Sequence, residues 1–407
     1  MVNGATTSGE LRAHNRVRLL RAVHDCGATL TRSQLTRDLR LARGTASVLV
    51  AGLAQDGLLH EEPAPEHVRG RPTQVPGPHP YGPLALAADV REDAWELAAC
   101  ELGGRVTVLD VRPHDGTPEG ALGPLGEAVA AHRRRLRHRV VGAGVALAGP
   151  VRHGGLVDIA HLGWRSVEVP RFFTDAPIVG NDTAFAALAE ARRGRLRDVE
   201  VGLHLHVDFD LGGVLIVRGR PLGGAGGMGA EFGHMPLTGG TRPCVCGAVG
   251  CWGMDVGANA LLRHVGLAYG GGRGREQAEH VLATSEEAVA AGARALGLGV
   301  AALVNAHDPE VVTLSGHGAE LYERAADSLL ETYEPGLMAI RRDHPPRIEC
   351  SALGWRGALL GAMESVFDAF LTPEGLDRWR ENHLDQARDT PERQNVTHST
   401  PKREKAP

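Results

Sequence analysis

Three segments with helical spacing of apolar residues open the chain. The first runs from Leu11 to Val23, where leucines and valines alternate with arginines, which predicts an amphipathic helix with a basic face. The second covers Thr31–Leu39, with the threonine placed to cap its start, and the third covers Arg43–Gln55, with Val48 on its apolar stripe. A short apolar run at residues 58–61 then favours a strand.

Three helices followed by a strand pair are typical of a winged helix-turn-helix, whose third helix enters the major groove by its N-terminal residues. A short basic loop, Val-Arg-Gly-Arg-Pro at 68–72, follows the strand where a wing is expected, and an arginine beside glycine can lie in a narrow minor groove. An ordinary helical bundle that contacts another protein is the alternative. The predicted DNA-binding residues are Arg43, Thr45, Ser47, Arg69 and Arg71.

Prolines crowd the stretch from residue 63 to 83, which we interpret as the wing and a semi-rigid linker. The first domain is therefore predicted to span residues 1–80. Its third helix begins after Ala42, which cannot accept a hydrogen bond from the first helical turn as Ser or Thr would.

From residue 81 the pattern changes to short apolar runs alternating with longer helical segments, which indicates an α/β domain over residues 81–371. One strand is expected to end at Asn181-Asp182, directly before an alanine-rich helix, so this pair should face a crevice at the carboxyl edge of a sheet. A pair that only caps the helix is the alternative. The predicted strands are 84–89, 95–100, 106–111, 140–148, 176–179 and 311–314, and the later helices are 286–305 and 357–370.

Charged and polar residues dominate after Thr372, and we expect residues 372–407 to be disordered. The net charge of −5 gives no basic signature to the whole chain, so any nucleic-acid contact must be local. No apolar run is long enough to span a bilayer and no basic-then-apolar leader is visible, which predicts a cytoplasmic protein without a membrane partner.

One histidine and three cysteines cluster in the segment EFGHMPLTGGTRPCVCGAVGC at residues 231–251. Thiolates this close repel one another unless a soft cation neutralises them, and Zn²⁺ prefers four tetrahedral nitrogen and sulfur ligands. A loop of free thiols is the alternative. The predicted zinc ligands are His234, Cys244, Cys246 and Cys251.

The sequence Gly-Ala-Glu-Phe-Gly-His at 229–234, followed by the CxCGxxGC knuckle at 244–251, resembles the signature of the ROK family of repressors and sugar kinases. The resemblance extends over about residues 11–371 and includes the Gly-Arg-Pro wing. It implies a two-lobed actin-like, hexokinase-like domain that follows the winged helix-turn-helix. It also implies that Asn181, Asp182, Glu231 and His234 contact a sugar, with Asp182 at the position of the kinase general base.

The same resemblance shows where the chain departs from a kinase. The two glycine-rich turns that would hold ATP phosphates fall at residues 89–93 and 207–213, where Asp208 and Asp210 place carboxylates instead. An acidic residue expected after the last knuckle cysteine is here Gly253. We therefore predict a non-enzymatic regulator, more often a repressor in this family, that binds operator DNA as a homodimer or homotetramer and senses a sugar. A residual sugar kinase and a constitutive DNA-binding protein with a decayed pocket are the alternatives.

Overall fold

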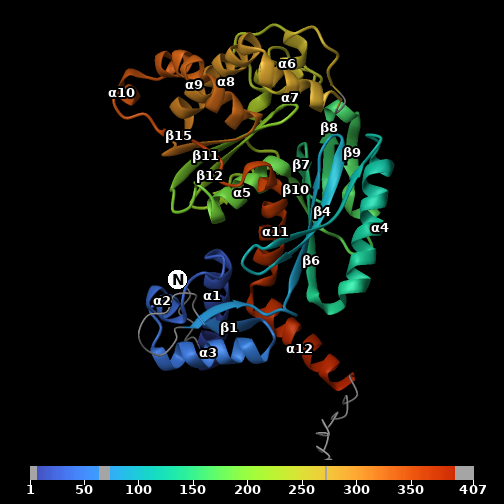
Figure 1. Cartoon of the computed structure of the whole chain (residues 1–407), viewed down its shortest axis with the longest axis vertical. Helices are drawn as coiled ribbons and strands as arrows, with labels where there is room; N and C mark the ends of the chain where they lie inside the picture. Colours follow the sequence, from blue (N-terminus) through green and yellow to red (C-terminus); the bar gives the residue numbers. More distant parts are fainter. Residues whose placement is uncertain (1–6, 64–73, 271–272, 390–407) are drawn as a thin grey trace, which may run out of the picture.

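The structure is a computed structural model that describes residues 7–63, 74–270 and 273–389. Figure 1 shows an elongated molecule in which the N-terminal helices lie at one end and a lobe built around α6–α9 lies at the other. A first lobe containing β3–β6 and α4 lies between them. The long helix α11 runs through the middle and approaches all three parts.

The N-terminal unit contains the three predicted helices and the strand. Its elements are α1 (Ser8–Asp25), α2 (Arg32–Asp38), α3 (Arg43–Gln55), β1 (Leu59–Pro63) and β2 (Gln74–Pro78). Thr31 caps α2 as predicted by accepting a hydrogen bond from the N–H of Gln34, whereas Ala42 gives α3 no side-chain cap. The second strand of the predicted pair lies at residues 74–78, inside the proline-rich stretch interpreted as wing and linker, and it is an edge strand antiparallel to β1. Prolines are tolerated there because an edge strand leaves one side of its backbone unpaired.

The first lobe is a five-stranded sheet with the order β10-β6-β3-β4-β5. Its strands are β3 (Leu84–Val90), β4 (Ala94–Glu101), β5 (Val106–Pro113), β6 (Val140–Leu147) and β10 (Ile178–Asn181). Side chains alternate between two cores: Leu86 and Trp95 pack against α4 (Pro118–Leu136), while Ala85 and Ala87 pack on the side of α11 (Gly357–Phe370). A small sheet of β7 (Val151–Arg152), β8 (Leu156–Ile159) and β9 (Trp164–Glu168) extends the lobe.

The second lobe repeats the pattern with the order β13-β12-β11-β14-β15. Its elements are β11 (Val201–Val207), β12 (Leu211–Val217), β13 (Arg220–Pro221), β14 (Val311–Gly316), β15 (Arg347–Cys350), α6 (Ala258–His264), α7 (Arg275–Thr284), α8 (Glu286–His307), α9 (His317–Gly336) and α10 (Ala339–Arg342). Ser285 caps α8 as its position predicts. In the described part of the chain, α8 is the one helix long and apolar enough to cross a membrane, but most of it is buried in the core of this lobe.

Both sheets have the same pairing along their length, with two antiparallel contacts followed by two parallel ones. In each sheet the chain first forms an antiparallel meander and then crosses through helices to a parallel strand. It passes from β5 through α4 to β6 in the first lobe, and from β13 through α6–α8 to β14 in the second. This duplicated α/β unit is the two-lobed actin-like, hexokinase-like architecture that was predicted.

Helices α5 (Asp182–Arg193) and α11 cross in close contact between the lobes. At the crossing, Gly361 leaves no room for a side chain, because an added Cβ would overlap the backbone carbonyl of Phe185. The close packing of α5 against α11 therefore requires glycine at position 361 because glycine has no Cβ, and not because its backbone is flexible.

We expect Gly361→Ala to lower the free energy of unfolding by about 2 kcal/mol or more, since forced overpacking outweighs the higher helix propensity of alanine. Gly52, inside α3, is the matched control because the nearest atom to a Cβ there is the flexible end of Arg16, in ordinary contact at 3.9 Å. Gly52→Ala should stabilise the protein by roughly 0.5–1 kcal/mol in urea unfolding. Equal effects of the two substitutions would contradict the close crossing.

The expectation of a disordered tail from residue 372 is wrong for its first part. Residues Pro373–Asp389 form α12, in which Leu376 and Trp379 are each 3% exposed. The Trp379 indole N–H donates a hydrogen bond of 2.8 Å to the carbonyl of Asp56, so α12 fastens the N-terminal unit to the body. Two apolar residues at i and i+3 suffice for this contact, and the polar composition around them conceals the pattern. Residues 390–407 lie outside the described residues.

Candidate functional site

The predicted metal ligands converge in a tight knuckle. The ligand atoms of His234, Cys244, Cys246 and Cys251 all lie within 4.8 Å of one another. The Sγ of Cys244 is 3.7 Å from Nδ1 of His234, and the Sγ atoms of Cys246 and Cys251 are 3.7 Å apart. Zn–S bonds of about 2.3 Å in a tetrahedron place the sulfurs roughly 3.8 Å apart, so these separations fit one Zn²⁺ ion.

The backbone of the knuckle explains its glycines. The N–H of Cys244 donates to the carbonyl of Ala248 at 2.8 Å, and the N–H of Gly247 donates to the carbonyl of Cys244 at 3.0 Å. Gly247 and Gly250 have φ values of 97° and 74°, which other residues rarely adopt. The turn therefore gathers the three sulfurs on one side and presents them to His234, at the end of the short helix Phe232–His234.

The four predicted effector residues, Asn181, Asp182, Glu231 and His234, line one cavity of about 360 Å³ between the lobes. Asn181 caps α5, since its Oδ1 accepts from the N–H of Ala184 at 2.9 Å. Its Nδ2 donates to the carbonyl of Gly149 at 3.1 Å and to Oδ1 of Asp182 at 3.0 Å. The pair is thus both a helix cap and part of the crevice wall, so the two interpretations of Asn181-Asp182 are compatible.

Burial changes the acidity of the crevice carboxyls. It raises the pKa of Asp182, and burial together with the charge of Asp182 raises the pKa of Glu231 to about 7. Burial also raises the pKa of Glu92 to about 8; this residue lines the same cavity and was not predicted as a site residue. The crevice therefore holds two carboxyl groups, those of Glu231 and Glu92, with pKa values near neutral pH.

A histidine–aspartate pair that was not predicted joins the two lobes at the crevice. His161, in the first lobe, hydrogen-bonds through Nε2 to the carboxylate of Asp210, in the turn between β11 and β12 of the second lobe. Burial acts to lower the pKa of His161, but the Asp210 hydrogen bond and charge outweigh it and raise that pKa to about 9. No sequence signal distinguishes His161, since its partner lies in the other lobe.

Asp210 also lies beside the position where an acidic side chain is missing. A Cβ built on Gly253 would be 3.5 Å from Oδ1 of Asp210. The other oxygen of this Asp210 carboxylate is hydrogen-bonded to His161.

Arg275 lies between the segments 89–93 and 207–213, which the resemblance assigns to phosphate binding in kinases. Its Nε donates to Asp93, in the first turn, at 2.8 Å, and its NH1 donates to Asp208, in the second turn, at 2.8 Å. The guanidinium also stacks over Phe209, 4.8 Å from the ring centroid. Burial acts to raise the pKa of Asp93, but the Arg275 hydrogen bonds outweigh it and lower that pKa. An internal ion pair thus joins the two turns across the lobes.

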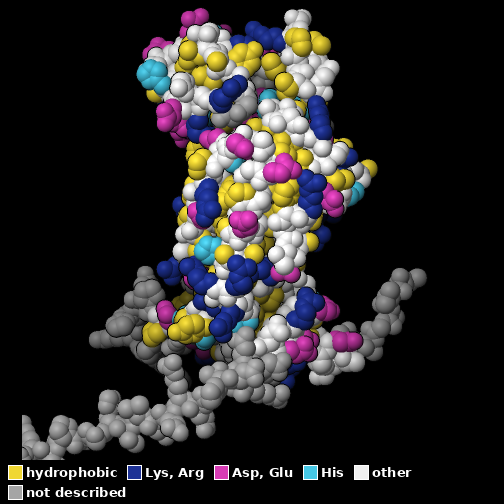
Figure 2. Space-filling view, turned by 90° about the vertical axis from the view of Figure 1, so that its right-hand side faces the viewer, with side chains coloured by type: hydrophobic (Ala, Val, Ile, Leu, Met, Phe, Trp, Pro, Cys, Tyr) yellow, Lys and Arg dark blue, Asp and Glu magenta, His cyan; other side chains and the backbone are white. Residues whose placement is uncertain are grey.

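The predicted DNA-binding residues that the structure describes are exposed. Arg43, Thr45 and Ser47 lie on the first two turns of α3 with their side chains at the surface, and the Ser47 hydroxyl donates to the carbonyl of Arg43 at 3.1 Å. Arg69 and Arg71 lie outside the described residues. The space-filling view in Figure 2 shows Lys and Arg side chains gathered on the body next to the N-terminal unit.

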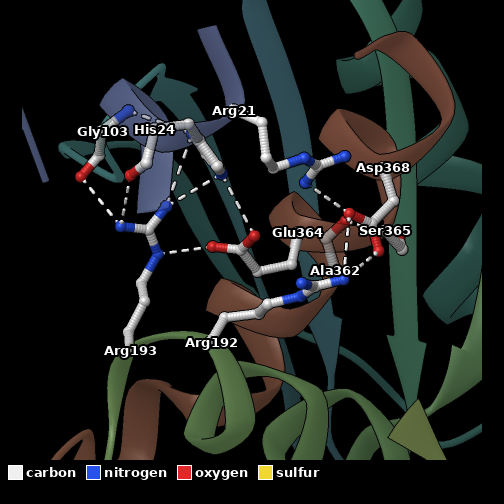
Figure 3. A network of polar contacts seen from close by, with 9 residues as sticks. All are labelled: Arg21, His24, Gly103, Arg192, Arg193, Ala362, Glu364, Ser365 and Asp368. Carbon is white, nitrogen blue, oxygen red and sulfur yellow. Dashed lines mark hydrogen bonds and ion pairs between the residues drawn. The ribbon is translucent and has the colours of Figure 1, made fainter. Parts of the chain in front are cut away.

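A buried polar network ties α1 to the helix that begins at the crevice (Figure 3). His24 is fully buried; its Nδ1 accepts from the N–H of Gly103 at 3.0 Å, so its Nε2 carries the proton and donates to Glu364 at 3.1 Å. Arg193, at the end of α5, donates from Nε to the other oxygen of Glu364 and from NH1 to the carbonyl of His24 at 3.2 Å. Beside it, Arg21 and Arg192 share the carboxylate of Asp368.

This network predicts an acid-sensitive contribution to stability. Burial acts to raise the pKa of Glu364, but His24 and Arg193 outweigh it and lower that pKa to about 2. A lowered folded-state pKa stabilises the fold above the ordinary glutamate pKa, and this stabilisation is lost as pH falls through the folded-state value. We expect Glu364→Gln to lower the free energy of unfolding by roughly 1–3 kcal/mol at pH 7, with the difference shrinking from about pH 4.5 towards pH 2.

Urea unfolding across this pH range tests the expectation, with the exposed Glu331→Gln as control. The control should change stability by less than about 0.5 kcal/mol at every pH. A pH-independent effect of Glu364→Gln would mean that the network is not ionised.

Comparison with known proteins places these features in one family. The ROK family profile matches residues 96–368. The chain is 26% identical over 259 residues to a putative xylose repressor of a Caldicellulosiruptor species, covering 57% of this chain and 64% of that protein. It is 25% identical over 308 residues to a glucokinase of Streptomyces coelicolor, covering 69% of this chain and 96% of the glucokinase.

Two regulators match over a larger part of the chain. The DNA-binding transcriptional dual regulator NagC of Escherichia coli is 24% identical over 381 residues, covering 87% of this chain and 92% of NagC. This chain also superposes on the crystal structure of a ROK family transcriptional regulator, a homologue of the E. coli MLC protein. The TM-score is 0.68 at 21% identity, and the match covers 91% of this chain and 99% of that regulator. The duplicated fold, the GAEFGH segment and the cysteine knuckle thus occur together in a chain whose greater part matches one profile. The protein belongs to the ROK family.

Proposed function

We propose that this chain is a cytoplasmic transcriptional regulator that binds operator DNA through α3 and senses a sugar in the interlobe crevice. The observation that carries this proposal is the Asp93–Arg275–Asp208 bridge, which fills with protein charges the region that a kinase needs for ATP phosphates. Three helices and a two-stranded sheet precede the ROK body, as a winged helix-turn-helix requires.

The extent of the similarities supports a regulator. The glucokinase of S. coelicolor covers 69% of this chain, whereas NagC covers 87% and the ROK regulator structure 91%. The additional portion of this chain therefore has counterparts in proteins described as regulators. Repression is the mode we favour, because the xylose repressor is among the relatives.

The network of Figure 3 offers a route by which the crevice could influence DNA binding. Helix α5 starts at Asn181 and Asp182 in the crevice and ends at Arg193, which contacts His24 of α1. A ligand that favours one arrangement of the lobes would move both ends of this helix. Such coupling is allosteric only if the two arrangements differ in ligand affinity.

We further propose that Zn²⁺ occupies the knuckle and holds His234 in the crevice wall. The donor set and its separations fit the ion, and a metal bound there would fix the orientation of a side chain that also lines the cavity. We expect the regulator to bind DNA as a homodimer or homotetramer, since two-fold operators pair with two-fold proteins.

The competing function is that of a sugar kinase, with Asp182 as general base. We expect no transfer of phosphate from ATP to glucose, mannose, xylose or their amino and N-acetyl derivatives, because Arg275 is already bound to Asp93 and Asp208 and the three side chains together carry a net negative charge. ATP with Mg²⁺ should also leave the thermal midpoint unchanged. Sugar-dependent ADP release that disappears in Asp182→Ala would establish the kinase instead.

A further inference from the structure

One acidic side chain of the crevice, Glu92, takes no part in the ion pairs that join the lobes. Glu92 is 8% exposed, lines the interlobe cavity, and its Oε2 is buried without a hydrogen-bond partner among the described residues. A buried carboxyl oxygen without a hydrogen-bond partner is unfavourable, and native proteins seldom leave one in that state unless a ligand or solvent completes it. Burial favours the neutral form of Glu92, and a cationic group placed beside it would favour the ionised form. The unpaired oxygen of Glu92 therefore indicates that a ligand in the cavity supplies its partner.

The other carboxylates of the crevice divide into two sets. Asp158, Asp208 and Asp210 are each paired within the chain, with Arg152, Arg275 and His161 respectively. Glu92, Asp182 and Glu231 form no ion pair with any lysine or arginine that the structure describes. Arg165 also lines the cavity, but its side chain is exposed to solvent. The inner part of the crevice thus holds more carboxyl groups than lysine or arginine side chains.

A metal ion fits this excess poorly. Among the described residues, the clusters whose ligand atoms approach closely enough to share an ion are the cysteine knuckle and a group around His24, and neither contains Glu92, Asp182 or Glu231. The carboxylates are therefore spread along the wall. A spread arrangement suits an organic ligand that carries a cationic group at one end and hydroxyl groups along its length.

We propose that the crevice binds an amino sugar with a free, protonated amine, whose ammonium group lies against Glu92 while its hydroxyl groups contact Asn181, Asp182 and Glu231. The inference rests on the proposed function of the crevice as the effector site and names the chemical class of that effector. The cavity of about 360 Å³ falls within the usual size range of small-molecule sites. The position of Glu92, in the turn that would be glycine-rich in a kinase, gives this chain a contact that the kinase pattern lacks.

The test is isothermal titration calorimetry of the full chain with matched sugars. The probes are glucose, its 2-, 3- and 6-amino-deoxy derivatives, and the N-acetyl form of each amine, which keeps the size but removes the charge. We expect at least one free amine to bind about tenfold or more tightly than glucose and its own N-acetyl form, as for a hydrogen bond between charged partners. Equal affinity for charged and neutral members of every pair would overturn the proposal.

Glu92→Gln is the decisive variant, because glutamine keeps the shape and removes the charge. The Glu92→Gln variant should bind the amine no more than about threefold more tightly than glucose. Its thermal midpoint should stay at or above that of the original chain, since Oε2 of Glu92 has no partner to lose. Glu276→Gln, at an exposed position on α7, should keep the full preference. An unchanged preference in Glu92→Gln would overturn the assignment, and so would tighter binding of Mg²⁺ or Ca²⁺ than of any amine.

Binding of the same sugars is also measured on the complex with DNA, so that two failures can be told apart. An amine that binds the crevice without changing DNA affinity would leave this inference standing and remove the proposed regulation. A sugar-responsive DNA complex that ignores the charge of the ligand would support the regulator and reject the amino sugar.

Discussion

Cys246→Ser is expected to abolish stoichiometric zinc binding and to lower the thermal midpoint by about 5 °C or more, because structural zinc contributes directly to folding free energy. Cys246 is exposed, so its replacement removes a ligand without opening a cavity in the core. The Sγ of Cys251, 3.7 Å away, would lose the cation that keeps it close to its neighbours. Elemental analysis of the purified protein and a thermal melt measure both effects.

Cys350→Ser is the matched control, since this half-buried thiol lies outside the knuckle. It should keep one equivalent of zinc and nearly the original midpoint. The variant at Cys246 should also bind sugars more weakly, because His234 faces Cys244 on one side and the crevice on the other. An unsubstituted protein that is free of metal and equally stable would contradict the zinc proposal.

Arg43→Glu should reduce operator affinity by roughly 100-fold or more, since a negative charge at the start of a recognition helix replaces an attraction to DNA by a repulsion. Arg43 is exposed at the first position of α3, so the fold should be unaffected and the thermal midpoint unchanged. Gel-shift or anisotropy titrations at several salt concentrations measure the loss.

Arg218→Glu is the matched control for this charge reversal. Arg218 is exposed on the second lobe, where it pairs with Glu200. DNA affinity should be the same as in the original chain within about twofold, because a screened charge far from the helix has little effect. Equal losses in the two variants would indicate non-specific electrostatics and would argue against α3 as the reading helix.

Local signals in the sequence were sufficient for much of the fold. The period of the apolar residues and the cap at Thr31 located the N-terminal helices, and α3 has the predicted bounds, Arg43–Gln55. The cysteine spacing located the knuckle, and the strand-then-helix pattern at Asn181-Asp182 together with the ROK resemblance located the four crevice residues. These contacts are made within a short stretch or at the end of one strand.

Contacts between distant segments could not be predicted in this way. Arg275 meets Asp93 across the lobes, and His161 meets Asp210 in the same manner, although nothing near either cation marks it as different from a surface residue. Helix α12 was missed because its buried face consists of little more than Leu376 and Trp379. In each case the pairing depends on the assembled fold, which sequence spacing does not encode.

The paired aspartates also change one argument from the sequence. Asp208 and Asp210 were expected to act as free negative charges that repel phosphates. Both are instead engaged, Asp208 with Arg275 and Asp210 with His161. In the proposed regulator, a phosphate group could enter this region only if these ion pairs between the lobes were broken.

The most direct test of the regulator is an anisotropy titration of the full chain against DNA from upstream of its own coding sequence, with a scrambled duplex for comparison. The regulator should bind the natural duplex tightly, and this binding should weaken by several orders of magnitude between about 50 and 200 mM salt. One sugar of the panel should change the affinity by about tenfold or more. Equal binding to the scrambled duplex, or no binding to either, would contradict the proposed function.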